Sequence, residues 1–112
     1  MVRSLLLNLF FALVLVACGQ STTNMRAVRV MAEVDATTPS ITLQWEAFPD
    51  AAGYSVFRRA AGATPWGAAI ATLPGSATAY EDASVSIGLA YEYKIQRSAE
   101  NTGYGYVRSG IA

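Results

Sequence analysis

Hydrophobic and polar residues alternate along most of the chain after position 27, and turn-forming residues recur at intervals of about ten positions. In the clearest case, Ile41, Leu43 and Trp45 alternate with polar neighbours. A period of two is typical of a strand with one buried face. The pattern predicts strands at residues 28–34, 41–45, 54–60, 66–73, 78–82, 89–98 and 104–111. No segment after position 27 has an amphipathic helical period, so we predict an all-β, antiparallel sandwich of two sheets.

The same alternation identifies the side chains that should fill the space between the sheets. In each predicted strand, every second residue is mostly aliphatic or aromatic, and the residues between them are mostly polar. The predicted core residues are Ile41, Leu43, Trp45, Tyr54, Val56, Tyr91, Tyr93 and Ile95. The chain has a single cysteine, so a disulfide within the domain is excluded and stability must come from this cluster.

Two stretches resemble the fibronectin type III family. ITLQWEAFPDAAGYSVFRR, from position 41, and TAYEDASVSIGLAYEYKI, from position 78, are similar to its central strands. The resemblance covers residues 26–112 and implies a seven-stranded immunoglobulin-like sandwich. It implies that Trp45 lies between the sheets, that Tyr91 forms a tyrosine corner and that Asp82 braces the turn after it. The Arg-Gly-Asp motif of some members is missing, so the resemblance does not imply cell attachment by that route.

The N-terminus has the organisation of an export signal. Arg3 precedes a stretch of thirteen residues, from Leu5 to Ala17, that is apolar except for Asn8. As a helix this stretch would be about 20 Å long, whereas a membrane core needs about 20 apolar residues to be crossed. A positive charge, a short apolar segment and a small residue at its end are typical of a cleaved signal.

Leu15, Val16, Ala17 and Cys18 resemble the lipobox of bacterial lipoproteins. The resemblance implies cleavage before Cys18 and lipid, such as palmitate, on that cysteine, after a signal at residues 1–17. Residues 18–25 then form a flexible tether, and Gly19 in place of an aspartate favours the outer membrane of the cell envelope. The alternative is an ordinary secretory signal that leaves Cys18 as a free thiol.

Composition excludes several functions. Eight basic residues balance eight acidic ones without a basic cluster, which argues against nucleic-acid binding. The absence of histidine argues against metal sites and Ser-His or Cys-His catalysis. Glu81 and Asp82 are neighbours on a strand and point to opposite faces, so they cannot act on one substrate together. We therefore expect no enzyme activity, no metal and no cofactor.

The strongest candidate for a binding site is an aromatic face on the third and last strands. In this fold the third, sixth and seventh strands share a sheet. The candidate residues are Phe57, Tyr104 and Tyr106, bordered by Arg59, Arg97 and Arg108. Such a face can stack on sugar rings or anchor a protein. The alternative is a cross-strand aromatic ladder that only stiffens the sheet. We expect Trp66 to cover a sheet edge.

Three functions remain open. The first is a monomeric, lipid-anchored binding or spacer module at the cell envelope, with a protein or glycan ligand. The second is an accessory domain of a larger secreted hydrolase or peptidase, which the reading frame after Ala112 would reveal. The third is a structural envelope lipoprotein that pairs with a partner through an open sheet edge.

Overall fold

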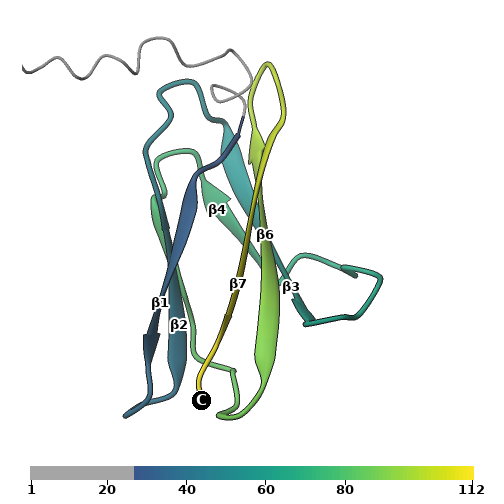
Figure 1. Cartoon of the computed structure of the whole chain (residues 1–112). Helices are drawn as coiled ribbons and strands as arrows, with labels where there is room; N and C mark the ends of the chain where they lie inside the picture. The colour runs from purple at the N-terminus through teal and green to yellow at the C-terminus, as the bar shows by residue number, and fades with distance from the viewer. Residues whose placement is uncertain (1–26) are drawn as a thin grey trace, which may run out of the picture.

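Residues 27–112, which the computed structural model describes, form seven strands and no helix. The strands are β1 (Val30–Asp35), β2 (Ser40–Trp45), β3 (Gly53–Ala60), β4 (Ala71–Pro74), β5 (Ala79–Asp82), β6 (Ala90–Ser98) and β7 (Gly103–Gly110). One sheet has the order β1-β2-β5 and the other β4-β3-β6-β7, and all neighbouring strands are antiparallel. Figure 1 shows the two sheets side by side with their strands running along the same long axis. The predicted seven-stranded β-sandwich is confirmed.

The fourth strand is shorter than predicted. It begins at Ala71 instead of position 66, and residues 61–70 form a loop that projects beyond the sandwich (Figure 1). Gly67 has a φ of 71°, a left-handed conformation that interrupts a strand. The alanines after it offer little side chain to bury in a sheet. The prediction of a strand at residues 66–70 is therefore wrong.

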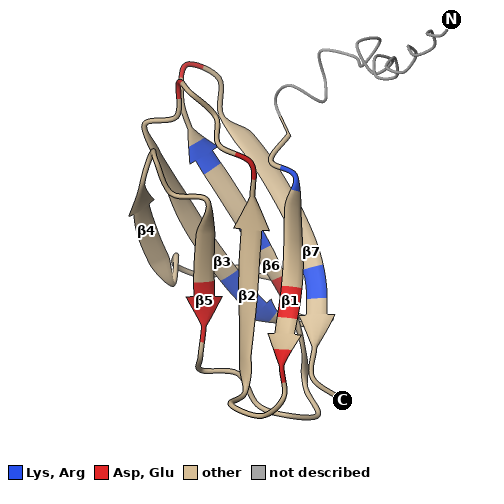
Figure 2. Ribbon diagram, turned by 90° about the vertical axis from the view of Figure 1, so that its left-hand side faces the viewer, with Lys and Arg blue, Asp and Glu red and all other residues tan. Residues whose placement is uncertain are grey.

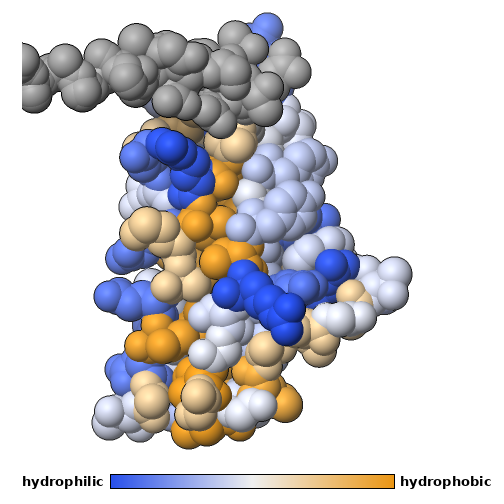
Figure 3. Space-filling view, in the orientation of Figure 1, coloured by the Kyte–Doolittle hydropathy of each residue, from blue (hydrophilic) through white to orange (hydrophobic). Residues whose placement is uncertain are grey.

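The first strand also begins later than predicted, because the chain at Val28 contacts the other sheet. The Val28 amide donates to the Tyr104 carbonyl in β7 at 3.0 Å, and the Val28 side chain is buried. A side chain at Gly105 would overlap the Val28 backbone, so this close approach depends on a glycine in β7. Figure 3 shows a band of hydrophobic residues running along the molecule on this side.

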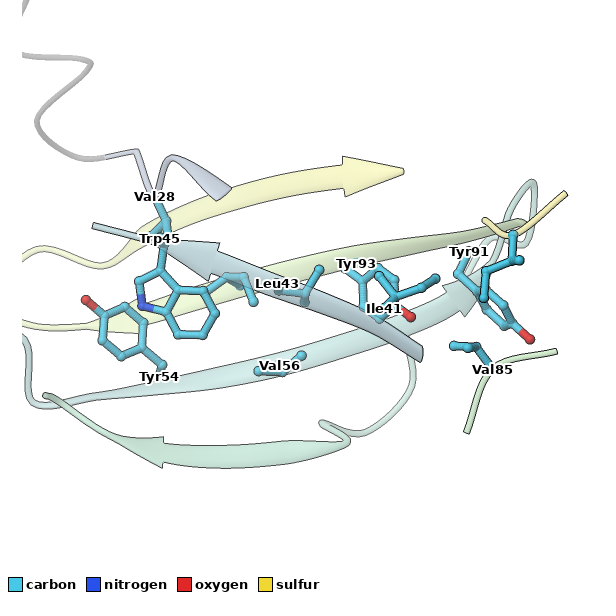
Figure 4. Packing of buried hydrophobic residues seen from close by; sticks show 11 residues of the cluster. Val28, Ile41, Leu43, Trp45, Tyr54, Val56, Val85, Tyr91 and Tyr93 are labelled. Carbon is cyan, nitrogen blue, oxygen red and sulfur yellow. The ribbon is translucent and has the colours of Figure 1, made fainter. Parts of the chain in front are cut away.

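The core lies between the two sheets, as Figure 4 shows. Its buried hydrophobic residues are Val28, Ile41, Leu43, Trp45, Tyr54, Val56, Val85, Tyr91, Tyr93, Ile95 and Ile111. Trp45 of one sheet packs on Tyr54 of the other, with 5.2 Å between ring centroids, and its indole N–H donates to the Ala77 carbonyl at 2.9 Å. The Tyr91 hydroxyl accepts from the Ser86 amide at 2.9 Å, which is the geometry of a tyrosine corner. Trp45 and Tyr91 thus keep a hydrogen-bond partner while their rings are buried.

Candidate functional site

Alternation along three neighbouring strands builds one outer face of the four-stranded sheet. On β3, Tyr54, Val56 and Arg58 point to the core side, so Phe57 and Arg59 point outward. The register across β3, β6 and β7 places side chains in rows. The rows are Arg59–Glu92–Arg108, Phe57–Lys94–Tyr106 and Ser55–Gln96–Tyr104. We call these residues, together with Trp66, the outer aromatic face.

Lys94 lies at the centre of this face, among aromatic rings. Its Nζ is 4.2 Å from the centroid of Phe57, 5.3 Å from that of Trp66 and 6.0 Å from that of Tyr104. These distances are within the range of cation–π attraction. Neither of the ion pairs formed within residues 27–112 involves Lys94, so its charge is balanced by ring faces instead of a carboxylate.

Arg59 holds the projecting loop against the face. Its Nε donates to Glu92 at 2.7 Å and its Nη1 donates to the Thr64 carbonyl at 2.6 Å. Its guanidinium lies 4.0 Å from the centroid of Trp66, which in turn is 6.2 Å from Tyr106. Trp66 therefore lies over β3, β6 and the edge strand β7 on the outer face, so it extends beyond the sheet edge where it was predicted.

Arg97 does not belong to this face. It has the same parity as Tyr93 and Ile95 and is 3% exposed, with its guanidinium 3.8 Å from the centroid of Phe48. The prediction that Arg97 borders the aromatic face is wrong, because residues two apart on a strand share a side. The structure brings the other five predicted residues together and adds Trp66, Lys94 and Glu92, which the sequence interpretation missed.

The sequence contains only part of the information needed to predict that Glu92, Lys94 and Trp66 belong to the outer aromatic face. The alternation of residues 89–98 already places Glu92 and Lys94 opposite the tyrosines. Their position between Phe57 and Tyr106 depends on the register of three strands, which the alternation does not give. The alternation gives no information on Trp66, because this residue lies in a loop and not in a strand.

A shallow pocket of about 270 Å³ opens on the outer aromatic face. It is lined by Arg59, Trp66, Glu92, Tyr93, Tyr106, Val107 and Arg108. Figure 3 shows strongly hydrophilic residues gathered where the projecting loop meets the sheet. Aromatic surface beside charged groups can hold a ring-shaped ligand by stacking and by hydrogen bonds together.

A larger hollow, of about 460 Å³, lies where β1 begins and β2 ends. Its lining is Arg29, Val30, Met31, Gln44, Trp45 and Glu46. Trp45 is its one aromatic residue, and that ring is buried with its N–H already bonded. This hollow therefore offers a ligand less aromatic surface than the outer aromatic face does.

The charges of the strands are segregated between the two sheets, as Figure 2 shows. Every lysine and arginine within a strand belongs to the four-stranded sheet, on β3, β6 or β7. The charged strand residues of the three-stranded sheet are all acidic: Glu33, Asp35, Glu81 and Asp82. On the outer aromatic face, three cations stand beside one carboxylate. A chain without net charge thus presents a positive surface on one side.

A second polar cluster lies on the core side of β3 and stabilises the fold. The Asp82 carboxylate is 1% exposed and accepts from Arg58 Nη1 at 2.8 Å, from the Tyr93 hydroxyl at 2.7 Å and from the Ser84 amide at 3.1 Å. Burial by itself would raise the pKa of Asp82, but the hydrogen bonds from Tyr93, Arg58 and Ser84 outweigh it and lower that pKa. The carboxylate is therefore charged and fully occupied, and it braces the turn at Ser84.

Burial and the Asp82 carboxylate act together on the other members of this cluster. Burial, followed by the hydrogen bond to Asp82, raises the pKa of the Tyr93 hydroxyl. Burial opposes the charge of Arg58, but the hydrogen bond and charge of Asp82 prevail and raise its pKa. All three groups thus keep their charge states through the physiological range.

The described part of the chain contains no group of three potential metal ligands and no helix long and apolar enough to span a membrane. The predicted lipidation site, Cys18, lies outside the described residues, as do the predicted signal and the whole of the predicted tether.

No family model matches the sequence, and neither does any curated protein. Among solved structures, an Fn3-like protein from Clostridium thermocellum is similar, with a TM-score of 0.57 and 25% identity over 70% of this chain and 86% of that one. The chain therefore has a fibronectin type III-like β-sandwich fold.

Two structures of pectate lyase PelI from Erwinia chrysanthemi are also similar. The one in complex with tetragalacturonic acid has a TM-score of 0.64 at 20% identity over 74% of this chain, and the other has 0.63 at 20% identity over 77%. This chain covers only 28% of the length of either lyase structure, so the similarity concerns the fold of one part of that protein.

Proposed function

We propose that this chain is an exported, lipid-anchored, non-catalytic module that binds a ligand at the bacterial cell envelope through the outer aromatic face. The observation that carries the proposal is the gathering of Phe57, Trp66, Tyr104 and Tyr106 around Lys94. Tyr104 is 43% exposed and Tyr106 is 62% exposed. Large aromatic side chains left in water beside hydrogen-bonding groups are typical of binding surfaces.

An aromatic ladder that only stiffens the sheet would need no contribution from a loop. Here residues 61–70 place an indole over the face, and Arg59 fixes the loop with a hydrogen bond to Thr64. Arg59 is itself oriented by Glu92. A pre-organised ring of this kind loses little conformational entropy when a ligand stacks on it, which favours a binding role.

The non-catalytic part of the proposal is supported by the carboxylates. Glu92, the one acidic residue on the face, is paired with Arg59 at 2.7 Å. Asp82 is buried in its cluster and Glu81 is exposed on the other sheet. No two of these carboxylates are placed to act on one substrate from opposite sides, as general acid–base chemistry on a glycoside requires.

The binding role is tested by a glycan array and by pull-down with the full chain. A triple Phe57→Ala, Tyr104→Ala, Tyr106→Ala variant should lose capture of the ligand that the wild type binds. Met31→Ala is the matched control, because Met31 is 66% exposed on the other sheet. Capture that survives in the triple variant, or a wild type that captures nothing, overturns the binding role and leaves a spacer.

A second candidate is an accessory module of a longer secreted enzyme. The observation that favours it is the similarity to part of a pectate lyase whose chain is much longer than this one. Sequencing the gene past Ala112 tests it. An in-frame catalytic domain would support this candidate, and a stop codon would refute it.

A further inference from the structure

The outer aromatic face has the chemistry of a site for an acidic sugar chain. We propose, resting on the binding function above, that its ligand is a polysaccharide of uronic acids, with sugar rings stacked on Trp66 and Tyr106 and a sugar carboxylate bound by Lys94. Each part of this proposal follows from a different feature of the face.

The first feature is a cation without an acidic partner. Lys94 Nζ is surrounded by the rings of Phe57, Trp66 and Tyr104, and neither ion pair within residues 27–112 includes it. Arg108 is exposed and likewise belongs to neither ion pair. Arg59, in contrast, is neutralised by Glu92. The face therefore carries two positive charges that a bound anion would complement.

The second feature is the line of aromatic rings. Tyr104 and Tyr106 are two residues apart on one side of β7, which separates their Cα atoms by about 7 Å. Trp66 extends this line, with its centroid 6.2 Å from that of Tyr106. Rings at successive positions suit a polymer of rings better than a single small molecule, because successive units can stack on successive side chains.

The third feature is the set of hydrogen-bonding groups around the rings. Ser55 and Gln96 point outward in the row that contains Tyr104, and Thr72 of β4 pairs with Ser55. Hydroxyl and amide groups can exchange hydrogen bonds with sugar hydroxyls. A nucleic acid fits less well, since its regular phosphates need a larger set of lysines and arginines. An acidic peptide would use the charges but leave the stacked rings without partners.

The experiment measures binding of the full chain, purified in detergent, to three polymers at 0.15 M salt by isothermal titration calorimetry. Polygalacturonate offers rings and carboxylates, its fully methyl-esterified form offers the same rings without charge, and polyglutamate offers carboxylates without rings. We expect polygalacturonate to bind at least about tenfold more tightly than either of the others. Lys94→Met and Trp66→Ala should each weaken that binding about tenfold. Arg29→Met removes one charge outside the face and should leave the affinity unchanged.

Each outcome separates this inference from the proposed function. Equal affinity for polygalacturonate and its methyl ester would overturn the acidic ligand while leaving a sugar-binding face. Equal affinity for polyglutamate would overturn it in favour of unspecific electrostatic attraction. If no polymer binds, the acidic ligand is wrong, and the glycan array and triple variant then decide separately whether the face binds anything. Thermal unfolding of Lys94→Met and Trp66→Ala verifies that lost binding is not lost folding.

Discussion

The two tryptophans of the chain have different environments, and their substitution should reduce stability to different extents. Trp45 is 5% exposed between the sheets and packs on Tyr54. We expect Trp45→Ala to reduce the free energy of unfolding by about 3–5 kcal/mol, because it leaves a cavity and an unpaired Ala77 carbonyl. Trp66→Ala, on the outer aromatic face, should cost only about 1 kcal/mol. Urea denaturation measures both, and equal losses would contradict the assignment of Trp45 to the core.

The buried carboxylate of Asp82 should make stability depend on acid. Its pKa is lowered in the folded state, so its stabilisation is complete above the ordinary carboxyl pKa of about 3.9 and is lost as the pH falls through the lower folded value. We expect Asp82→Asn to cost at least about 2 kcal/mol at pH 7, since Arg58, Tyr93 and Ser84 lose a charged acceptor. The difference between wild type and variant should shrink below about pH 4.

Denaturation curves at several pH values measure this dependence. Glu100→Gln, at an exposed turn, is the control and should leave the free energy of unfolding nearly unchanged at neutral pH. A difference between wild type and Asp82→Asn that stays constant down to pH 2 would show that the carboxylate does not carry the stabilisation.

At the level of strands, the alternation of hydrophobic and polar residues predicts those strands that have one buried face. Strands with one buried face, such as β2 and β6, lie within a residue or two of their predicted bounds. The alternation fails to predict the structure at positions 66–70. There the contact of Trp66 with the Arg59 cation and the left-handed conformation of Gly67 favour a loop instead of a strand. The alternation also predicts the direction of side chains. Arg97 is two residues from Ile95 and therefore points inward, but its charge led to the prediction of a surface position.

The candidate site was less predictable than the fold because it depends on neighbours that are distant in sequence. Phe57 and Tyr106 meet Lys94 only through the pairing of β3, β6 and β7. The sequence alone supports several registers, and each one would surround Lys94 with different residues. The loop that supplies Trp66 adds a contact that no periodic pattern encodes.

The contact between the start of the domain and β7 depends on a single glycine. A Cβ at Gly105 would overlap the Val28 carbonyl, so the chain at Val28 would have to move away from β7. We expect Gly105→Ala to lower the free energy of unfolding by about 1–3 kcal/mol through overpacking. Hydrogen exchange should show faster exchange of the Val28 amide, which donates to Tyr104. Ser109→Ala on the same strand is the control, and slow Val28 exchange in Gly105→Ala would contradict the expectation.

The whole molecule combines an asymmetric surface with a proposed attachment point. The strand cations belong to the sheet that carries the outer aromatic face, and the acidic strand residues dominate the other sheet (Figure 2). An acidic polymer would therefore be attracted to one side of the domain and repelled from the other. A binding module with one active side works best when it is held at a surface, which would give the proposed lipid anchor a physical purpose.

The anchor proposal predicts what happens when Cys18 is changed. In a bacterial host the full chain should incorporate radiolabelled palmitate and fractionate with membranes, because two or more acyl chains hold a protein stably, whereas one holds it only marginally. Cys18→Ser should abolish the label and remove the mature domain from the membrane fraction, since a hydroxyl does not replace the thiol that accepts lipid. Ser21→Ala, three positions further along, is the control and should keep both label and location. A wild type that takes up no palmitate would instead establish the ordinary secretory signal, and the positive face would then have to find its ligand from solution.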